Sequence, residues 1–191
     1  MKIFFVESQI TAPDSLLTGL LPDIQAIILD GHQYGIAQIS SVLQQNPQIQ
    51  TVHIVSHGSP GCLYLGNSEL NLTNIYQYQQ LLQHWNVKNI VLYGCNVAAG
   101  DAGSEFIHKL HKITKAQITA TATKTGNPKL GGNWHLEVNY PTPPLLREAG
   151  GDQTLTKAET PTTPLTKAET LTPPLVRGAG QGGLIVERTN K

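Results

Sequence analysis

A histidine and a cysteine follow two apolar runs whose ends could carry out nucleophilic chemistry. Residues 52–58 read VHIVSHG and residues 90–96 read IVLYGCN. Each run is rich in β-branched and aromatic residues and stops at a reactive side chain beside a glycine. In an α/β sheet, the residues just past the carboxyl ends of strands line the crevice where ligands bind. The thiol of Cys95 and the imidazole of His57 could act there as a nucleophile and its general base.

The residues around these two side chains suit the same chemistry. Cys95 precedes a helix that we expect to begin near Asp101, and a thiol near a helix N-terminus and an imidazole has an increased thiolate fraction. Gly58 has no side chain, so its backbone can approach a substrate closely. The backbone N–H groups of Gly58 and Cys95 could donate hydrogen bonds to a developing oxyanion. Asn96 could polarise a substrate or simply shape the turn.

Other roles remain open for these residues and their neighbours. Asp101 could recognise a basic substrate side chain, although capping the next helix is the more common role of such an aspartate. Cys62 could be inert, or it could form an inactivating disulfide with Cys95 under oxidation. A zinc site is conceivable, but the spacing of its candidate ligands matches no established pattern, so we predict neither a metal nor a cofactor. These candidate ligands are His53, His57, Cys62 and Cys95.

The elements that would position these residues alternate between strands and helices. Apolar runs predict strands at residues 2–6, 25–30, 50–56, 88–93, 117–122 and 134–138. Helical spacing of apolar residues predicts helices at 35–45, from Thr73 to about Trp85, and after Asp101. Residues 62–72 are typical of a hairpin. This alternation predicts an α/β fold with a mainly parallel sheet covered on both faces.

Composition changes after Tyr140. All aromatic residues, both cysteines and all histidines lie in residues 1–140, whereas every arginine lies beyond them. The LTKAET sequence at 155–160 returns at 165–170, and this part of the chain is rich in Pro, Thr and Gly. Such a segment cannot bury enough apolar surface to offset the entropy lost on ordering. We therefore predict one domain at 1–140 and a disordered repeat tail at 141–191.

Charge and hydropathy exclude several classes of partner. The formal net charge is +0, which gives no electrostatic argument for nucleic acid or an anionic membrane. No apolar run approaches the ~20 residues of a membrane span. The apolar stretch within residues 1–7 is too short for a signal-peptide core of roughly 7–15 residues. We therefore expect a cytoplasmic protein that acts on a peptide or protein, without nucleic acid and without a membrane span.

The histidine motif resembles that of caspases. In that family a strand, a Ser-His-Gly turn and a hairpin are followed by a helix and then by a hydrophobic strand that ends in the catalytic cysteine. Residues 25–122 have the same order and spacing. The resemblance extends more loosely to gingipain-type and other bacterial peptidases of the same clan. It implies a three-layer caspase-like sandwich in which His57 is the base, Cys95 the nucleophile, and Gly58 with Cys95 the oxyanion hole.

A closer similarity is to a bacterial domain family of unknown function. It rests on the segments HIVSHG at 53–58 and LYGCNVAAG at 92–100, and on an LGGNW stretch at 130–134. The similarity covers nearly all of residues 1–140. Members of that family often head very large, repeat-rich surface or secreted proteins, so relatives of this chain could be secreted as parts of larger proteins.

Two functions remain open. The first is a caspase-like cysteine endopeptidase that uses a His57–Cys95 dyad. The second is a catalytically inactive caspase-like module that binds a peptide or protein. Residues 1–140 contain no arginine, which is the best partner for an acidic substrate side chain, and they place Asp101 near the expected cleft. We therefore expect the peptidase to prefer basic residues before the scissile bond.

Overall fold

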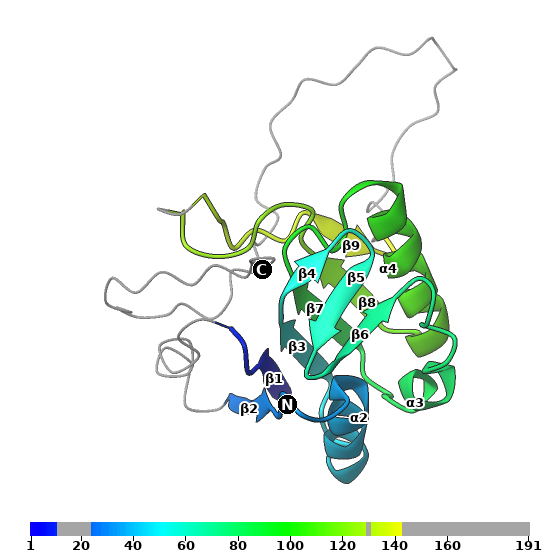
Figure 1. The fold of residues 1–191 in the computed structure, drawn as a ribbon. Helices are drawn as coiled ribbons and strands as arrows, with labels where there is room; N and C mark the ends of the chain where they lie inside the picture. Colours follow the sequence, from blue (N-terminus) through cyan, green and yellow to red (C-terminus); the bar gives the residue numbers. More distant parts are fainter. Residues whose placement is uncertain (11–23, 129–130, 143–191) are drawn as a thin grey trace, which may run out of the picture.

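A mostly parallel sheet forms the centre of the molecule (Figure 1). The computed structural model describes residues 1–10, 24–128 and 131–142. The strands of the sheet follow the order β2-β1-β3-β7-β8-β9, and every neighbouring pair is parallel except β8 with β9. The predicted α/β class is therefore confirmed. The strands are β1 (Lys2–Glu7), β2 (Gln25–Leu29), β3 (Thr51–Val55), β7 (Asn89–Tyr93), β8 (Gln117–Ala120) and β9 (Val138–Tyr140).

The described helices flank one face of this sheet. They are α2 (Gly35–Gln45), α3 (Gln79–Gln83) and α4 (Gly100–Thr114). Their buried apolar side chains share one core cluster with alternate strand residues such as Phe5, Ile54 and Leu92. A connection between two parallel strands of one sheet is almost always right-handed, so all connections that cross the sheet in the same direction lie on the same face. The connections from β2 to β3, from β3 to β7 and from β7 to β8 all cross the sheet in the same direction. None of these helices is both long and apolar enough to cross a membrane.

The opposite face of the sheet has a different cover. The intervening strand residues, among them Phe4, Val55 and Tyr93, form a second apolar cluster there. In the described part of the chain this cluster is covered by irregular segments, through side chains such as Trp134 and Leu136. The connection from β1 to β2 runs through residues 11–23, outside the described residues. The two faces of the sheet are therefore covered by different kinds of structure.

A small antiparallel sheet follows β3 and precedes the helices that lead to β7. It consists of β4 (Gly58–Ser59), β5 (Cys62–Leu65) and β6 (Ser68–Asn71), in that order. The predicted hairpin is therefore confirmed. Gly66 connects β5 to β6 with a φ of 62°, a left-handed conformation that favours glycine.

Several element boundaries differ from those predicted. The helix expected from Thr73 contains a regular turn only at α3, because the Asn71 side chain accepts hydrogen bonds from the backbone N–H groups of Thr73 and Asn74 and holds this stretch in a turn. The strand expected at 134–138 begins only at Val138. The predicted tail lies outside the described residues, apart from residues 141 and 142.

The start of α4 is packed tightly against the turn that follows Cys95. A Cβ atom at Gly103 would lie only 2.2 Å from the carbonyl carbon of Ala98, so no side chain fits at this position. In most helix interiors alanine is more stable than glycine by about 1 kcal/mol. Here the close contact reverses that preference, and it fixes the turn at residues 95–98 relative to the helix.

Candidate functional site

Strands β3 and β7 bring His57 and Cys95 to the same edge of the sheet. The two strands are parallel neighbours, and Val55 is paired with Tyr93 at their carboxyl ends. His57 and Cys95 each follow two residues later. Cys95 packs in the same cluster as Val55 and Tyr93, on the face of the sheet that lacks described helices. Both residues therefore lie past the carboxyl ends of adjacent strands, where ligand sites of α/β sheets are found.

Gly58 permits the two strand ends to touch. A Cβ atom at this position would lie 2.9 Å from the carbonyl oxygen of Cys95 and 3.0 Å from its backbone nitrogen. Real Cβ atoms essentially never approach backbone atoms so closely. The missing side chain therefore allows close approach to the backbone of Gly94 and Cys95, which is a packing role that the sequence did not indicate.

The backbone N–H of Gly58 is directed away from the small sheet. The N–H of Tyr64 donates to the carbonyl oxygen of His57 at 3.1 Å, and Gly58 is paired with Leu63. Hydrogen-bonded and non-hydrogen-bonded pairs alternate in antiparallel strands. Gly58 therefore belongs to a non-hydrogen-bonded pair, and its N–H faces away from β5.

The His57 ring is held on the side of β1. The ring is buried, and its Nε2 lies 3.4 Å from the carbonyl oxygen of Gln9 and 3.9 Å from Oε2 of Glu7. Glu7 Oε2 also accepts a 3.5 Å hydrogen bond from the backbone N–H of His57. If Nε2 carries the proton and donates to Gln9, then Nδ1 is the basic nitrogen. Nδ1 is buried and has no hydrogen-bond partner among the described residues.

Glu7 and Gln9 are site residues that the sequence prediction missed. Glu7 is a carboxylate only 2% exposed, and it stands at the end of β1, the strand next to β3. The signal in the sequence was an acidic residue that directly follows an apolar strand, in the same pattern that singled out His57 and Cys95.

The Cys95 thiol is held on the opposite side. Its sulfur is buried and accepts a 3.3 Å hydrogen bond from the backbone N–H of Thr125, in the segment after β8. The thiol also lies 3.7 Å from the carbonyl oxygen of Thr125. Glu7 lies on the β1 side and Thr125 on the β8 side, so the partners of the imidazole and of the thiol come from opposite sides. Among the described residues, no hydrogen bond joins the His57 ring to the Cys95 thiol.

Asn96 and Asp101 have local structural roles. Asn96 has a φ of 58°, and its N–H donates to the carbonyl oxygen of Thr123 at 2.9 Å, so it shapes the turn after Cys95. Asparagine tolerates this left-handed conformation better than most residues. Asp101 does not cap α4, because the N-cap is Ala99 and no side chain makes the capping hydrogen bond. Asp101 is exposed in the first turn, where a negative charge interacts favourably with the helix dipole.

Cys62 is separated from Cys95 by the alternation of β5. The neighbouring Leu63 directs its side chain toward Gly94, so Cys62 faces the other side of the small sheet, 3.9 Å from a carboxylate oxygen of Glu69. Burial raises the pKa of the Cys62 thiol, and the negative charge of Glu69 raises it further. Neither cysteine forms a disulfide. Within the described residues, no group of three or more His, Cys, Asp or Glu side chains could hold a metal ion.

His53 is part of an aromatic stack beneath the site. Its ring lies parallel to that of Phe4, with 4.1 Å between centroids, and its Nδ1 lies 3.4 Å from the hydroxyl oxygen of Tyr93. Its Nε2 is buried, and no hydrogen-bond partner lies in the part of the chain that the structure describes. Burial lowers the pKa of His53 to about 4, and the charge of Lys2 contributes in the same direction. His53 is therefore neutral at physiological pH.

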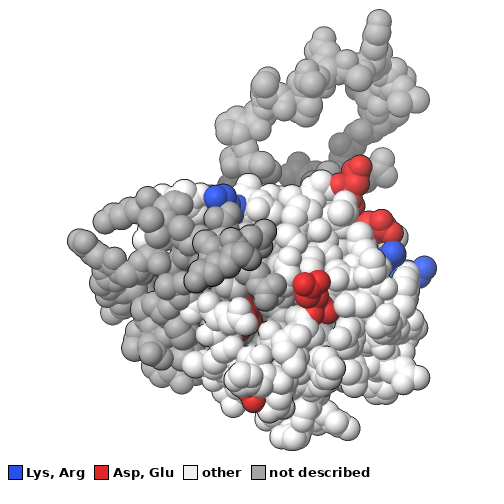
Figure 2. Space-filling view, in the orientation of Figure 1, with Lys and Arg blue, Asp and Glu red and all other residues white. Residues whose placement is uncertain are grey.

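Charged side chains are sparse around the fold. On the face of the molecule shown in Figure 2, the described Lys, Arg, Asp and Glu residues lie singly or in groups of mixed sign. Lys109 and Glu105 on α4 form an ion pair of 2.8 Å. This face therefore has no extended field of one sign to attract a polyanion or a polycation.

Comparison with known families places the chain among proteins without an assigned activity. The model of the domain of unknown function DUF4347 matches residues 3–151, so the chain belongs to this family. None of the curated proteins matches the chain.

The buried, neutral His53 should make stability depend on pH. The unfolded chain protonates this ring near pH 6.5 and the folded protein only near pH 4, so the unfolded state binds more protons between these values. The contribution of His53 to stability is fully present above about pH 6.5. Acidification to pH 4 should lower the free energy of unfolding by up to about 3 kcal/mol. His53→Phe, which can keep the stack on Phe4, should reduce this slope in urea titrations. The exposed control His84→Gln should retain it, and equal slopes in all three proteins would contradict the assignment.

Proposed function

We propose that this member of the DUF4347 family is a caspase-like cysteine endopeptidase with a His57–Cys95 dyad. One observation carries the proposal: an imidazole residue and a thiol residue follow neighbouring parallel strands, and Gly58 lets the two strand ends come into backbone contact. The carboxyl edge of such a sheet is the usual place for a ligand site. Order along the chain, strand adjacency and residue chemistry support the same pairing of base and nucleophile.

Cys95 is the proposed nucleophile. Its sulfur accepts a hydrogen bond from the N–H of Thr125 at 3.3 Å, and this contact holds the side chain in place until a substrate displaces it. Attack on a peptide carbonyl forms a carbon–sulfur bond, and the oxyanion accepts hydrogen bonds from the N–H groups of Gly58 and Cys95. Collapse breaks the carbon–nitrogen bond, and His57 gives its proton to the leaving amine. Water, deprotonated by His57, then hydrolyses the acyl-enzyme.

His57 is the proposed base, and Glu7 is the residue that positions it. Gln9 and Glu7 hold Nε2 of the ring, which leaves the buried Nδ1 to receive the proton of the thiol. A carboxylate beside the ring favours the imidazolium form that follows proton transfer, as in the triads of other hydrolases. Glu7 lies beside both the ring and the backbone N–H of His57, so we propose that it acts through that residue.

Substrate access requires movement of the cover of Cys95, by which we mean the segments that contain Thr125, Trp134 and Leu136. Cys95 is 1% exposed, so the closed form described here does not present the thiol to a peptide. Thr125 holds the sulfur, and Trp134 contacts Tyr93 in the same cluster, with 6.2 Å between ring centroids. Displacement of this cover would also allow the thiol to turn toward His57. Catalytic hydrogen bonds often form only in the substrate complex.

Burial of the thiol favours the second candidate, a catalytically inactive caspase-like module that binds a peptide or protein. A fully buried cysteine commonly acts as a small hydrophobic side chain. Such a module needs no activated thiolate. Iodoacetamide at neutral pH would distinguish the two, because the peptidase should be alkylated at Cys95 well before Cys62, whose pKa is raised.

Peptides with a basic residue before the scissile bond are the proposed substrates. Asp101 lies exposed in the first turn of α4, shortly after the turn that contains Cys95 and Asn96. Its carboxylate could pair with a Lys or Arg side chain of a substrate extended across this edge. Asn96 could contact the same substrate through its side-chain amide.

Removal of the proposed nucleophile should abolish cleavage. We expect no turnover of a broad peptide library by Cys95→Ala, and a loss of about three orders of magnitude or more in kcat/KM for His57→Ala. Cys62→Ala is the matched control and should keep substantial activity, because its thiol faces Glu69. Cleavage by Cys95→Ala at the wild-type rate would reject the mechanism. A wild-type protein that cleaves nothing would favour the binding module.

The basic preference should depend on Asp101. In pairs of peptides that differ only before the scissile bond, the wild type should cleave the Arg or Lys peptide faster than the Asp peptide. Asp101→Asn should narrow that ratio of kcat/KM, because it removes the charge and keeps the side-chain volume. Glu105→Gln, one helical turn further along α4, should leave the ratio unchanged. A ratio that is the same in all three proteins would exclude this role for Asp101.

Replacement of Glu7 should alter how the dyad responds to pH. Glu7→Gln keeps the size of the side chain and removes its charge, so the imidazolium next to it loses a favourable interaction. We expect kcat to fall about tenfold or more. We also expect the pH profile of Cys95 alkylation to move to higher pH, which a purely structural residue would not produce. An unchanged profile in a folded Glu7→Gln protein would show that Glu7 has only a structural role.

A further inference from the structure

Strand β2 forms an open edge of the central sheet. Within the described residues it pairs only with β1, and Ile28, its next-to-last residue, is 44% exposed. An edge strand presents unpaired N–H and C=O groups that can accept a further strand. This edge carries an exposed apolar side chain where proteins often place a lysine or a proline.

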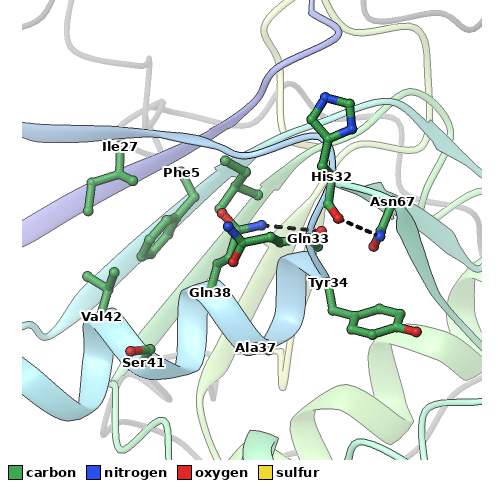
Figure 3. Close-up of a pocket in the computed structure, with 11 residues that line it drawn as sticks. Phe5, Ile27, His32, Gln33, Tyr34, Ala37, Gln38, Ser41, Val42 and Asn67 are labelled. Carbon is green, nitrogen blue, oxygen red and sulfur yellow. Dashed lines mark hydrogen bonds between the residues drawn. The ribbon is translucent and has the colours of Figure 1, made fainter.

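A groove of about 640 Å³ lies beside this edge (Figure 3). Ile27 of β2 and Val42 of α2 point toward one another across it, and Phe5 of β1 lies behind them. Gln38 and Ser41 contribute polar groups on the helix side. The described residues that line the groove include no Asp, Glu, Lys or Arg. His32, Gln33 and Asn67 also line it, so the groove suits uncharged side chains, with apolar ones placed against the apolar residues.

We propose that residues 184–186 of this same chain bind along β2 as an added strand. They read Leu-Ile-Val, the longest uninterrupted apolar run in residues 143–191, and two of the three are β-branched, as is typical of strands. This assignment of the C-terminal segment is independent of the proposed peptidase activity.

The alternation of side chains fits both faces of β2. Ile27 and Leu29 line the groove, whereas Ile28 points to the other face. In an added strand Leu184 and Val186 would enter the groove and Ile185 would cover Ile28. The charged residues that follow the run would then lie beyond the uncharged groove.

The connection is long enough for binding within one molecule. Thr142 is the last described residue, and 42 peptide steps separate it from Leu184. At about 3.3 Å per residue this connection spans up to about 140 Å, several times the diameter of a domain of this size. Covalent linkage raises the effective concentration of the segment at the groove, so few contacts suffice for binding.

Hydrogen–deuterium exchange of the full chain tests the proposal. We expect amides of residues 185–187 to exchange about tenfold or more slowly than those of residues 165–168, because the added strand hydrogen bonds to β2. Ile185→Asp should remove this protection and also speed exchange in residues 26–29. Leu165→Asp, an equal change elsewhere in the C-terminal part, should affect neither region.

A variant in the groove tests the proposal without any change to residues 184–186. Ser41→Glu places a charge at the exposed side of the groove and should speed exchange at 185–187, whereas Gln45→Glu on the same helix should not. Full exchange of 185–187 in the wild type would overturn the proposal. So would β2 exchange that is unchanged by Ile185→Asp. Protection that disappears on dilution would overturn it as well, and would identify a second copy as the occupant.

Discussion

The contact between Gly58 and the backbone of Gly94 and Cys95 determines the geometry of the whole carboxyl edge. Because an added Cβ atom would lie 2.9 Å from backbone atoms, the end of β3 can meet the end of β7 only through a glycine. The same kind of constraint acts at Gly103, where α4 packs on Ala98. Together these contacts clamp the turn that contains Cys95 between the small sheet and the helix. The positions of both reactive residues follow from backbone packing.

Side-chain direction at this edge is set by the neighbours of β3 and β7. Strand β1 supplies Glu7, and the turn after it supplies the carbonyl of Gln9; both lie beside Nε2 of the His57 ring. The segment after β8 supplies Thr125, which lies beside the Cys95 sulfur. Nε2 of His57 and the Cys95 sulfur thus each have a partner from the neighbouring strand or segment, since a buried polar group without partners is costly. The two backbones meet while the two functional groups remain separate.

The sequence predicted the elements that follow from the periodicity of apolar residues. It did not predict features that depend on a contact with a residue far along the chain. The apolar runs at β1, β3 and β7 and the helical spacing in α2 and α4 were sufficient for the fold class. The helix expected from Thr73 is shorter than predicted because the side chain of Asn71 holds that stretch in a turn. Asp101 does not cap α4, because Ala99 occupies the N-cap position. Nothing in the local pattern places Thr125 beside Cys95 or Glu7 beside His57, because those contacts arise from the order of strands in the sheet.

The difference between an enzyme and a binding module lies in the cost of opening the cover over Cys95. That cover is bound together: Asn133 hydrogen bonds to Thr123 and Lys124, and Gly126 donates to the carbonyl of Asn133. It therefore moves as one unit that includes Thr125. Its apolar anchors, Trp134 and Leu136, are only partly buried, so their release costs less than the ~1.5–3 kcal/mol of a fully buried large side chain. On the other face of the sheet, the helices bury their apolar sides in the main core. The side of the sheet that holds the thiol therefore has the weaker apolar anchoring of the two, and the proposed opening for a substrate belongs on that side.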